Sequence, residues 1–294
     1  MRVAPFARRQ AGAGLGVFIA AVAVMAVSCD SARAQGKVEA SYRATLAGIP
    51  IGSGSWIIDI GPKHYAGAAN GHASGLMRVL VSGEGSSTVR GIVRKGRLIP
   101  AIIAANIRSA DSYDVRMEMS GGNVKVLKNE PPVLESPDRV PLTDTHRRGV
   151  LDPMTALMIS VPGNGEVVSE EACHAKLPIF DGRQRFDLTL SFKRIEAVET
   201  EKGYRGPAVV CSASYAPIAG HRPGRYVIRY LQETRDIEIW LAPIAGTRVL
   251  IPYRVSIPTL FGNAILQAAQ FETEAQAPTP SRAANPSERP ARGS

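Results

Sequence analysis

The fold class is decided by the stretch Phe186-Asp187-Leu188-Thr189-Leu190-Ser191-Phe192-Lys193, in which apolar and polar residues alternate without a break. A period of two places the apolar side chains on one face of an extended strand, whereas a helix would spread them around its axis. Residues 113–119 alternate in the same way, and after Gly121-Gly122 the pattern resumes at Val124 and Val126. We therefore predict a half-buried strand in the first stretch and a hairpin in the second.

Outward from these stretches, the pattern divides the chain into two groups of strands. Residues 37–128 form the first group, residues 129–162 contain a proline-rich loop and a helix, and residues 165–273 form the second group. Roughly a dozen strands at turn spacing predict a mainly β protein built on one curved antiparallel sheet, an open barrel or β-spiral. A two-lobed arrangement remains the alternative. Residues 274–294, rich in Pro, Ala, Ser and Arg, are expected to form a disordered tail.

One short helix is expected after Asp152. Asp152 suits the N-cap and Pro153 the first helical position, and Met154, Leu157 and Met158 recur at helical spacing. We expect two or three turns, ended by the pair Pro162-Gly163 and covering the sheet or the mouth of a barrel. Further strands are predicted around Tyr226, Ile228 and Tyr230, around Ile237 to Leu241, and over residues 249–260 and 264–271.

The first 34 residues have the layout of a secretory signal peptide. Arg2, Arg8 and Arg9 form a positive start, and the stretch from Leu15 to Val27 is uncharged and apolar. Ala32-Arg33-Ala34 then matches the small-x-small pattern of a cleavage site, which predicts cleavage after Ala34 and export of residues 35–294 to the periplasm. An uncleaved anchor is disfavoured because the apolar stretch is short for a membrane span.

Cys29 offers a second interpretation of this segment. Ala26-Val27-Ser28-Cys29 resembles a lipobox, whose cysteine is lipidated. A lipobox has leucine three places before its cysteine, where Ala26 stands here, and the Ala32–Ala34 site follows just downstream. We therefore favour cleavage after Ala34 over lipidation of Cys29.

Composition and charge exclude several classes of protein. The chain has 294 residues, of which 45% are apolar and 21% charged, so it is not disordered throughout. Its formal net charge is +9, and because residues 1–34 contribute +3, the exported chain carries +6. A basic excess favours anionic partners such as lipid headgroups or acidic glycans. The predicted compartment argues against nucleic acid.

Cleavage after Ala34 leaves two cysteines, Cys173 and Cys211. An even number of cysteines in an exported protein predicts a disulfide bond. Cys173, His174, Cys211 and His221 also make up a set of ligands that zinc accepts. Their spacing matches no zinc motif, and adjacent residues on a strand point to opposite faces. We favour the disulfide over the metal site.

No catalytic motif is recognisable. Residues 71–75 read Gly-His-Ala-Ser-Gly and so miss the Gly-x-Ser-x-Gly pattern of a serine hydrolase, and no glycine-rich phosphate-binding motif opens a helix. A glycosidase needs two carboxylates a set distance apart, which the sequence does not reveal. The eligible acidic residues are Glu170, Glu171, Asp181 and Asp187. We expect neither an enzyme nor a cofactor.

The other candidate residues have simpler structural interpretations. His64, His72 and His146 are isolated, and the basic run His146-Arg147-Arg148 suits phosphate or carboxylate groups, although a solvated loop face is the first expectation. Four methionines are candidates for the lining of an apolar cavity, although packing in the core is the first expectation. They are Met117, Met119, Met154 and Met158.

Three segments resemble one family of exported bacterial proteins. Residues 42–52 resemble its opening strand with two glycines, Asp152 to Leu157 its Asp-Pro helix, and Ile251 to Val255 its closing strand. The family is catalogued as domain of unknown function 3108, and the resemblance covers about residues 37–271. It implies a periplasmic, β-rich protein and brings no catalytic residues. The layout also resembles β-spiral envelope proteins held by one disulfide, and lipoprotein carriers with a curved sheet.

These observations favour a non-catalytic periplasmic protein that binds a hydrophobic or envelope-derived ligand and supports the integrity of the cell envelope. Its expected partners are a lipid-like ligand or an envelope protein, with no nucleic acid and at most peripheral membrane contact. The first alternative is a scaffold protein without a ligand pocket. A hydrolase acting on envelope glycans or lipids is the least favoured class.

Overall fold

The computed structural model describes residues 35–74, 83–109 and 112–276. The predicted signal peptide, with Cys29 and the Ala34 cleavage site, and the part of the predicted tail from residue 277 onward lie outside these residues. The described strands, in chain order, are β1 (Gly36–Leu46), β2 (Ile49–Ile60), β3 (His64–Ala73), β4 (Glu84–Arg94), β5 (Arg97–Arg108), β6 (Tyr113–Ser120), β7 (Asn123–Glu130), β8 (Ile159–Ser160), β9 (Lys176–Phe180), β10 (Arg185–Glu199), β11 (Lys202–Gly203), β12 (Arg205–Ala219), β13 (Ile237–Pro243), β14 (Val249–Thr259) and β15 (Gly262–Ala275).

Helical segments are few and short in the described part of the chain. Two are α-helices, α2 (Pro153–Ala156) and α3 (Tyr226–Glu233), and two are single 3₁₀ turns, η1 (Asp144–Arg147) and η2 (Glu170–Cys173). None of them is long and apolar enough to cross a membrane.

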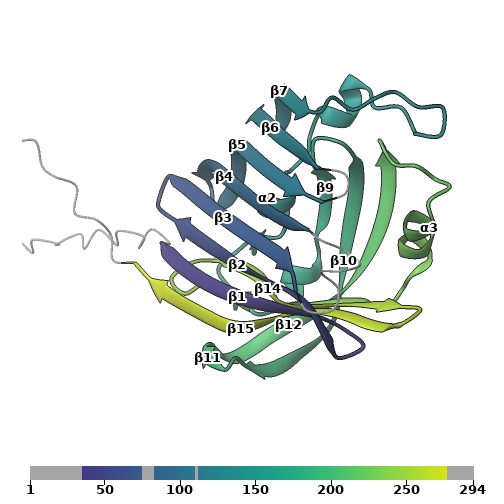
Figure 1. Cartoon of the computed structure of the whole chain (residues 1–294). Helices are drawn as coiled ribbons and strands as arrows, with labels where there is room; N and C mark the ends of the chain where they lie inside the picture. The colour runs from purple at the N-terminus through teal and green to yellow at the C-terminus, as the bar shows by residue number, and fades with distance from the viewer. Residues whose placement is uncertain (1–34, 75–82, 110–111, 277–294) are drawn as a thin grey trace, which may run out of the picture. The chain divides into compact units, whose positions relative to one another are not determined.

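The strands form one large sheet, as the alternating sequence predicts. Its strands follow the order β7-β6-β5-β4-β3-β2-β1-β15-β14-β13-β12-β10-β9, with β8 beside β14 and β11 beside β15. The first seven strands are a simple meander in which each pairs with the next along the chain (Figure 1). The pairing of β1 with β15 joins this meander to the second group, from Gly36 opposite Ala275 to Leu46 opposite Ala264.

The sheet is curved but not closed by strand pairing among the described residues, since its order ends at β7 on one side and β9 on the other. A short connecting segment lies between the two edges. The amide of Val150 donates to the carbonyl of Gly122 at 2.8 Å, and that of Leu151 donates to Pro178 at 2.8 Å. The side chain of Asn129 reaches Gly182 at 3.1 Å. The expectation of an open barrel is confirmed.

A hydrophobic core fills the space between the two strand groups. Val38 and Ile58 from the meander and Phe271 and Ile251 from the second group are each fully buried in it. The four candidate methionines, Met117, Met119, Met154 and Met158, are buried in this core and pack it, as first expected. The second group also covers a second core on its other face, which is why Ala208 to Cys211 form a continuous buried run.

The helix after Asp152 begins as predicted but is shorter than predicted. Asp152 Oδ1 accepts hydrogen bonds from the amides of Met154 at 2.9 Å and Thr155 at 3.1 Å. Only Pro153–Ala156 are helical, because Ile159–Ser160 pair with β14 as strand β8. The turn lies between the strand groups, in contact with β9, β4 and β5.

The strand predicted around Tyr226, Ile228 and Tyr230 is wrong, because these residues form helix α3. Their alternation is equally compatible with a helix: Tyr226 and Tyr230 are one turn apart, with ring centroids 5.7 Å from each other. Ile228 is buried and Leu231, three residues on, packs against the second core. Three alternating residues are too few to distinguish a strand from a helix.

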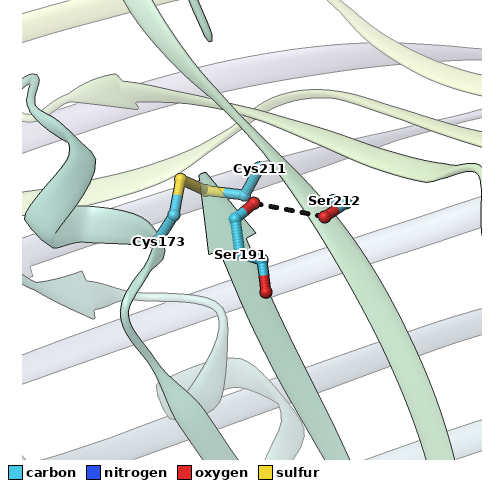
Figure 2. The surroundings of a disulfide bond; sticks show 4 residues. All are labelled: Cys173, Ser191, Cys211 and Ser212. Carbon is cyan, nitrogen blue, oxygen red and sulfur yellow. Dashed lines mark hydrogen bonds between the residues drawn. A yellow bond between two sulfur atoms is a disulfide. The ribbon is translucent and has the colours of Figure 1, made fainter. Parts of the chain in front are cut away.

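The predicted disulfide is present. Cys173 on η2 and Cys211 on β12 are joined, with their Cα atoms 5.4 Å apart, and both are fully buried (Figure 2). The bond fixes the segment that contains η2 against the outer face of the second strand group. Because each sulfur is bonded to the other, neither is available as a thiolate ligand for zinc.

Removing this bond in a Cys173→Ala/Cys211→Ala variant is expected to lower the free energy of unfolding by about 4 kcal/mol, the chain-entropy value for a closed loop of 38 residues. Thermal unfolding under non-reducing conditions measures the change. Reduced wild-type protein is the control and should unfold near the midpoint of the variant. Equal midpoints for the variant and the oxidised wild type would contradict a structural role for the bond.

Candidate functional site

A pocket with a cavity of about 390 Å³ opens where the two free edges of the sheet approach each other. It is lined by the start of β6, the loop after β7, the turn between β9 and β10, and the segment that leads from β12 into α3. We call it the arginine pocket, after the four arginines in its lining: Arg139, Arg183, Arg222 and Arg225.

Backbone hydrogen bonds hold the loops of the arginine pocket together. The amide of Val140 donates to the carbonyl of His221 at 2.9 Å, and the amide of Gly220 donates to Val140 at 2.8 Å. Arg139 adds a bond from its guanidinium to the Gly220 carbonyl at 2.7 Å. Gly220 has a φ of +78°, and a Cβ there would lie 2.2 Å from the carbonyl oxygen of Arg183. Only glycine lets these two loops approach so closely.

The turn between β9 and β10 is stabilised by Asp181. Its Oδ1 accepts hydrogen bonds from the amides of Arg183 at 2.8 Å and Gln184 at 2.6 Å. Burial raises the pKa of Asp181, and the two amide bonds oppose this rise. The turn directs Arg183 over the ring of Tyr113, with the guanidinium carbon 4.4 Å from the ring centroid. Such a cation–π contact orients the side chain but leaves its charge uncompensated.

The described lining of the pocket carries an excess of positive charge. Four guanidinium groups share one lining carboxylate, that of Asp181. Arg222 has an acidic partner outside the lining, Asp138, at 3.3 Å. Burial, followed by repulsion from Arg222 and Arg183, lowers the pKa of Arg139. The arginines therefore repel one another, and an anion placed among them would relieve that repulsion.

His221 is the second sign of a ligand site. It is 8% exposed, and its Nδ1 atom has no hydrogen-bond partner among the described residues. Burial lowers the pKa of this imidazole, so it is neutral near pH 7. The Nε atom of Arg139 is likewise buried without a described partner. Buried polar atoms are rarely left unpaired, so both atoms are suited to contact a bound molecule.

One side of the pocket is apolar. Val227 and Ile228, at the first turn of α3, line it together with Pro131 and the ring of Tyr113. Val227 is 52% exposed. The Arg225 side chain makes no cap hydrogen bond to α3, so free backbone N–H groups at the start of this helix add to the positive character of the pocket. The site combines cations with apolar surface.

A family model described as "Protein of unknown function (DUF3108)" matches residues 41–268 of this chain. The chain belongs to this family. Its expected membership is thus confirmed, and the DUF3108 domain includes every residue that lines the arginine pocket. No curated protein matches the chain. A crystal structure of a beta-barrel-like protein of DUF1849 from Brucella abortus is similar at 9% sequence identity and a TM-score of 0.42, covering 82% of this chain and 99% of that one.

The structure separates the sequence-predicted site residues. Two of them lie in the arginine pocket: His221, a candidate zinc ligand, and Asp181, a candidate carboxylate of a hydrolase. His174 is exposed, with its Nδ1 3.6 Å from Glu171. Glu170, Glu171 and His174 form an exposed group at η2.

Asp187 lies outside the pocket, paired with Arg185 on β10 and with Lys176 at 3.4 Å. The described pocket lining therefore has no carboxylate pair of the kind that a glycosidase uses. The histidines predicted to be isolated also lie elsewhere: His64 and His72 are on β3, and His146 is on η1 beside Arg147, which pairs with Asp144 at 3.6 Å.

The four arginines of the pocket were not recognised from the sequence. They come from three separate connecting segments, and only the fold brings them together. The available signal was the stretch Gly220-His221-Arg222-Pro223-Gly224-Arg225, in which two cations stand among loop-forming residues.

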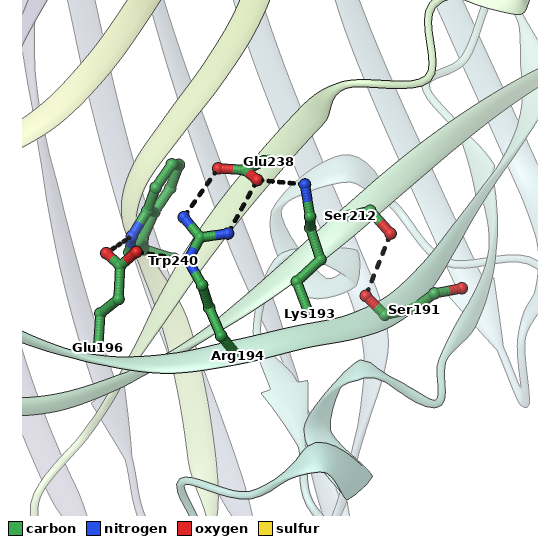
Figure 3. A network of polar contacts seen from close by, with 7 residues as sticks. All are labelled: Ser191, Lys193, Arg194, Glu196, Ser212, Glu238 and Trp240. Carbon is green, nitrogen blue, oxygen red and sulfur yellow. Dashed lines mark hydrogen bonds and ion pairs between the residues drawn. The ribbon is translucent and has the colours of Figure 1, made fainter.

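A second polar cluster has its charges compensated and acts in stability. Glu238 on β13 bonds to Lys193 and Arg194 of β10, and Glu196 accepts the indole N–H of Trp240 at 2.7 Å (Figure 3). Two guanidinium groups lie near the centroid of the Trp240 ring, that of Arg194 at 5.6 Å and that of Arg254 at 4.9 Å. The cluster links β10 to β13 across β12, the strand that lies between them.

Glu238 makes the stability of this cluster dependent on pH. Bonds from Arg194, and then from Lys193, lower the pKa of Glu238 to about 2, from an ordinary value of 4.5. A depressed carboxyl pKa stabilises the fold fully above the unfolded value, and the contribution is lost as pH falls from about 4.5 to about 2. Glu238→Gln is expected to lower the free energy of unfolding at pH 7 by roughly 2–3 kcal/mol.

Calorimetric unfolding of Glu238→Gln and wild type at pH 7 and at lower pH measures this effect. The gap between their midpoints should narrow as the pH falls through the window below 4.5. Glu118→Gln is the matched control, because Glu118 on β6 is exposed and pairs with no described cation. A gap of constant size at all pH values would show that the loss comes from packing and not from the ion pair.

Proposed function

We propose that this chain is a non-catalytic binding protein of the bacterial cell envelope, and that its arginine pocket holds the anionic group of an envelope-derived ligand. The observation that carries this proposal is the excess of positive charge in the described pocket lining: four guanidinium groups against one carboxylate, beside a buried His221 whose Nδ1 has no described hydrogen-bond partner. Phosphate is the best match, since guanidinium groups bind its oxygens through paired, charge-assisted hydrogen bonds. The two negative charges of a phosphate monoester suit this excess.

The apolar side of the pocket supports a ligand with an apolar portion. Val227, Ile228 and Pro131 face the same cavity as the arginines, so a phosphate bound there would bring whatever is attached to it against these side chains. Phosphorylated lipids of the envelope have this combination of groups. Side chains fill the space between the strand groups, so we propose that the lipid-like ligand binds at this edge of the sheet and not inside the barrel.

Two features support the proposed compartment. The leader-like residues 1–34 suit an exported protein, and the Cys173–Cys211 bond suits the oxidising periplasm. A non-catalytic role is proposed because the described pocket lining holds one carboxylate, that of Asp181, and not the carboxylate pair that hydrolysis of a glycan uses. Its excess of positive charge suits the binding of an anion. A part in envelope integrity would follow from capture of such a ligand.

The test is calorimetric titration of the protein with dihexanoyl phosphatidate, which is soluble, and with dihexanoyl phosphatidylcholine, in which the phosphate monoester is lost. Wild type should bind the phosphatidate more tightly. Arg183→Gln/Arg225→Gln should weaken that binding by about tenfold or more, because each guanidinium contributes charge-assisted hydrogen bonds. Native mass spectrometry of protein purified from cells is the companion measurement and should reveal a co-purified, lipid-sized mass.

Arg229→Gln provides the matched control. Arg229 lies one helical turn from Arg225 on α3, is exposed, and does not line the pocket. Arg229→Gln removes one positive charge, where the pocket variant removes two, and it should change the affinity less than about twofold, in keeping with the small effect of an exposed charge in salt. Equal losses in the control and the pocket variant, or no binding by wild type, would reject the proposal.

A further inference from the structure

Two neighbouring hairpin turns form an exposed apolar tip at one end of the sheet. Leu260 and Phe261 occupy the turn between β14 and β15 and are 71% and 77% exposed, and Ile49 follows the turn between β1 and β2 and is 61% exposed. The amide of Ala47 donates to the carbonyl of Asn263 at 3.0 Å, so the two turns are in direct contact. We call Ile49, Leu260 and Phe261 the apolar tip.

The parts of the strands nearest the apolar tip lack charged side chains and histidine. Residues 44–58 and residues 255–271 contain no Asp, Glu, Lys, Arg or His, in a chain of which 21% is charged. The two stretches are paired, with Leu46 opposite Ala264 and Thr45 opposite Ile265. Figure 1 shows both turns at the same end of the sheet. This end is therefore uncharged over several neighbouring strands.

Part of the backbone at the tip is already hydrogen bonded. Thr259 Oγ1 donates to the carbonyl of Gly262 at 2.5 Å and accepts the amide of Phe261 at 3.2 Å. Ala47 is bonded across to the second turn, as described above. An apolar medium penalises unpaired backbone groups, and this tip leaves fewer of them than an open loop would.

Helix α3 adds aromatic and cationic groups beside the tip. The hydroxyl of Tyr230 donates to the carbonyl of Pro258 at 2.9 Å, two residues before Leu260. Tyr226 lies against Tyr230 and is 55% exposed, and Arg229 on the same helix is exposed. Tyrosine at the level of the headgroups and arginine near anionic phosphates are the side chains that favour a membrane interface.

We propose that the apolar tip inserts into the outer part of a lipid bilayer that contains anionic lipid, and so holds the protein at a membrane surface. A protein partner is a poorer match, since a stable interface buries about 800 Å² on each side and three side chains on two turns offer far less. A bilayer requires no such area and accepts a few apolar side chains at the boundary between headgroups and acyl chains. This proposal is independent of ligand binding in the arginine pocket.

Vesicle co-sedimentation tests the proposal with the full chain, expressed with its own leader. All variants carry Cys29→Ser, so that no acyl chain on Cys29 contributes to binding. Vesicles of phosphatidylethanolamine and phosphatidylglycerol should bind the reference protein. Leu260→Ser/Phe261→Ser should reduce the partition coefficient by about tenfold or more, since two large apolar side chains no longer enter the bilayer.

The matched control is Ile102→Ser/Leu134→Ser. Ile102 and Leu134 are 46% and 79% exposed and lie on β5 and in the loop after β7, away from the tip. This control should bind vesicles like the reference protein, and both double variants should keep its unfolding midpoint. An equal loss in tip and control variants, or full binding by the tip variant, would overturn the proposal.

Depth measurement supplies a readout at the tip itself. In Phe261→Trp the new indole should be quenched by brominated acyl chains, whereas the reference protein, whose Trp56 and Trp240 are 7% and 6% exposed, should show little quenching. A concentration-dependent dimer that the tip variant abolishes, together with no quenching, would make a second copy of the chain the occupant and overturn the proposal. Arg183→Gln/Arg225→Gln should leave the quenching intact, which separates this proposal from ligand binding.

Discussion

The pairing of β1 with β15 is the constraint on which the rest of the structure depends. It joins the first and last strands along eleven residues of β1, from Gly36 to Leu46, and so turns two strand groups into one sheet. Once the chain ends are joined there, the free edges must be the strands at mid-chain, β7 and β9. The sheet curves round a core to which both groups contribute side chains. The gap between its free edges lies beside the long connections that follow β7 and β12. The arginine pocket is built from those connections.

This arrangement also explains why the proposed ligand site lies at the rim of the sheet and not inside the barrel. An open sheet of this size must bury one face, and the side chains that meet there are large: Phe271, Ile58, Met117 and Ile251 are all fully buried. Because these side chains fill the interior, the polar groups proposed to recognise a ligand lie at the rim of the sheet. The second group buries its other face as well, under η2 and the Cys173–Cys211 bond. Burial of both faces makes β12 and its neighbours a rigid support for the loops at their ends.

Sequence reasoning recovered the features that depend on local periodicity and failed where contacts are long-range. The alternation at residues 186–193 lies in β10, the residues 113–126 form the hairpin of β6 and β7, and Asp152 caps a helix as expected. The same rule misassigned residues 226–230, because three alternating apolar residues are compatible with a strand and a helix alike. Charge clustering is not periodic at all. Arg139 and Arg225 are far apart in the chain and become neighbours of one cavity only through the pairing of Val140 with Gly220 and His221.

Helix α3 connects the two proposed binding regions. Its first turn lines the arginine pocket, and its Tyr230 bonds to Pro258 at the base of the apolar tip. Arg225 and Tyr230 are five residues apart in the chain, which corresponds to roughly 8 Å along a helix axis. The helix that local sequence periodicity failed to identify is thus the element that connects the two regions.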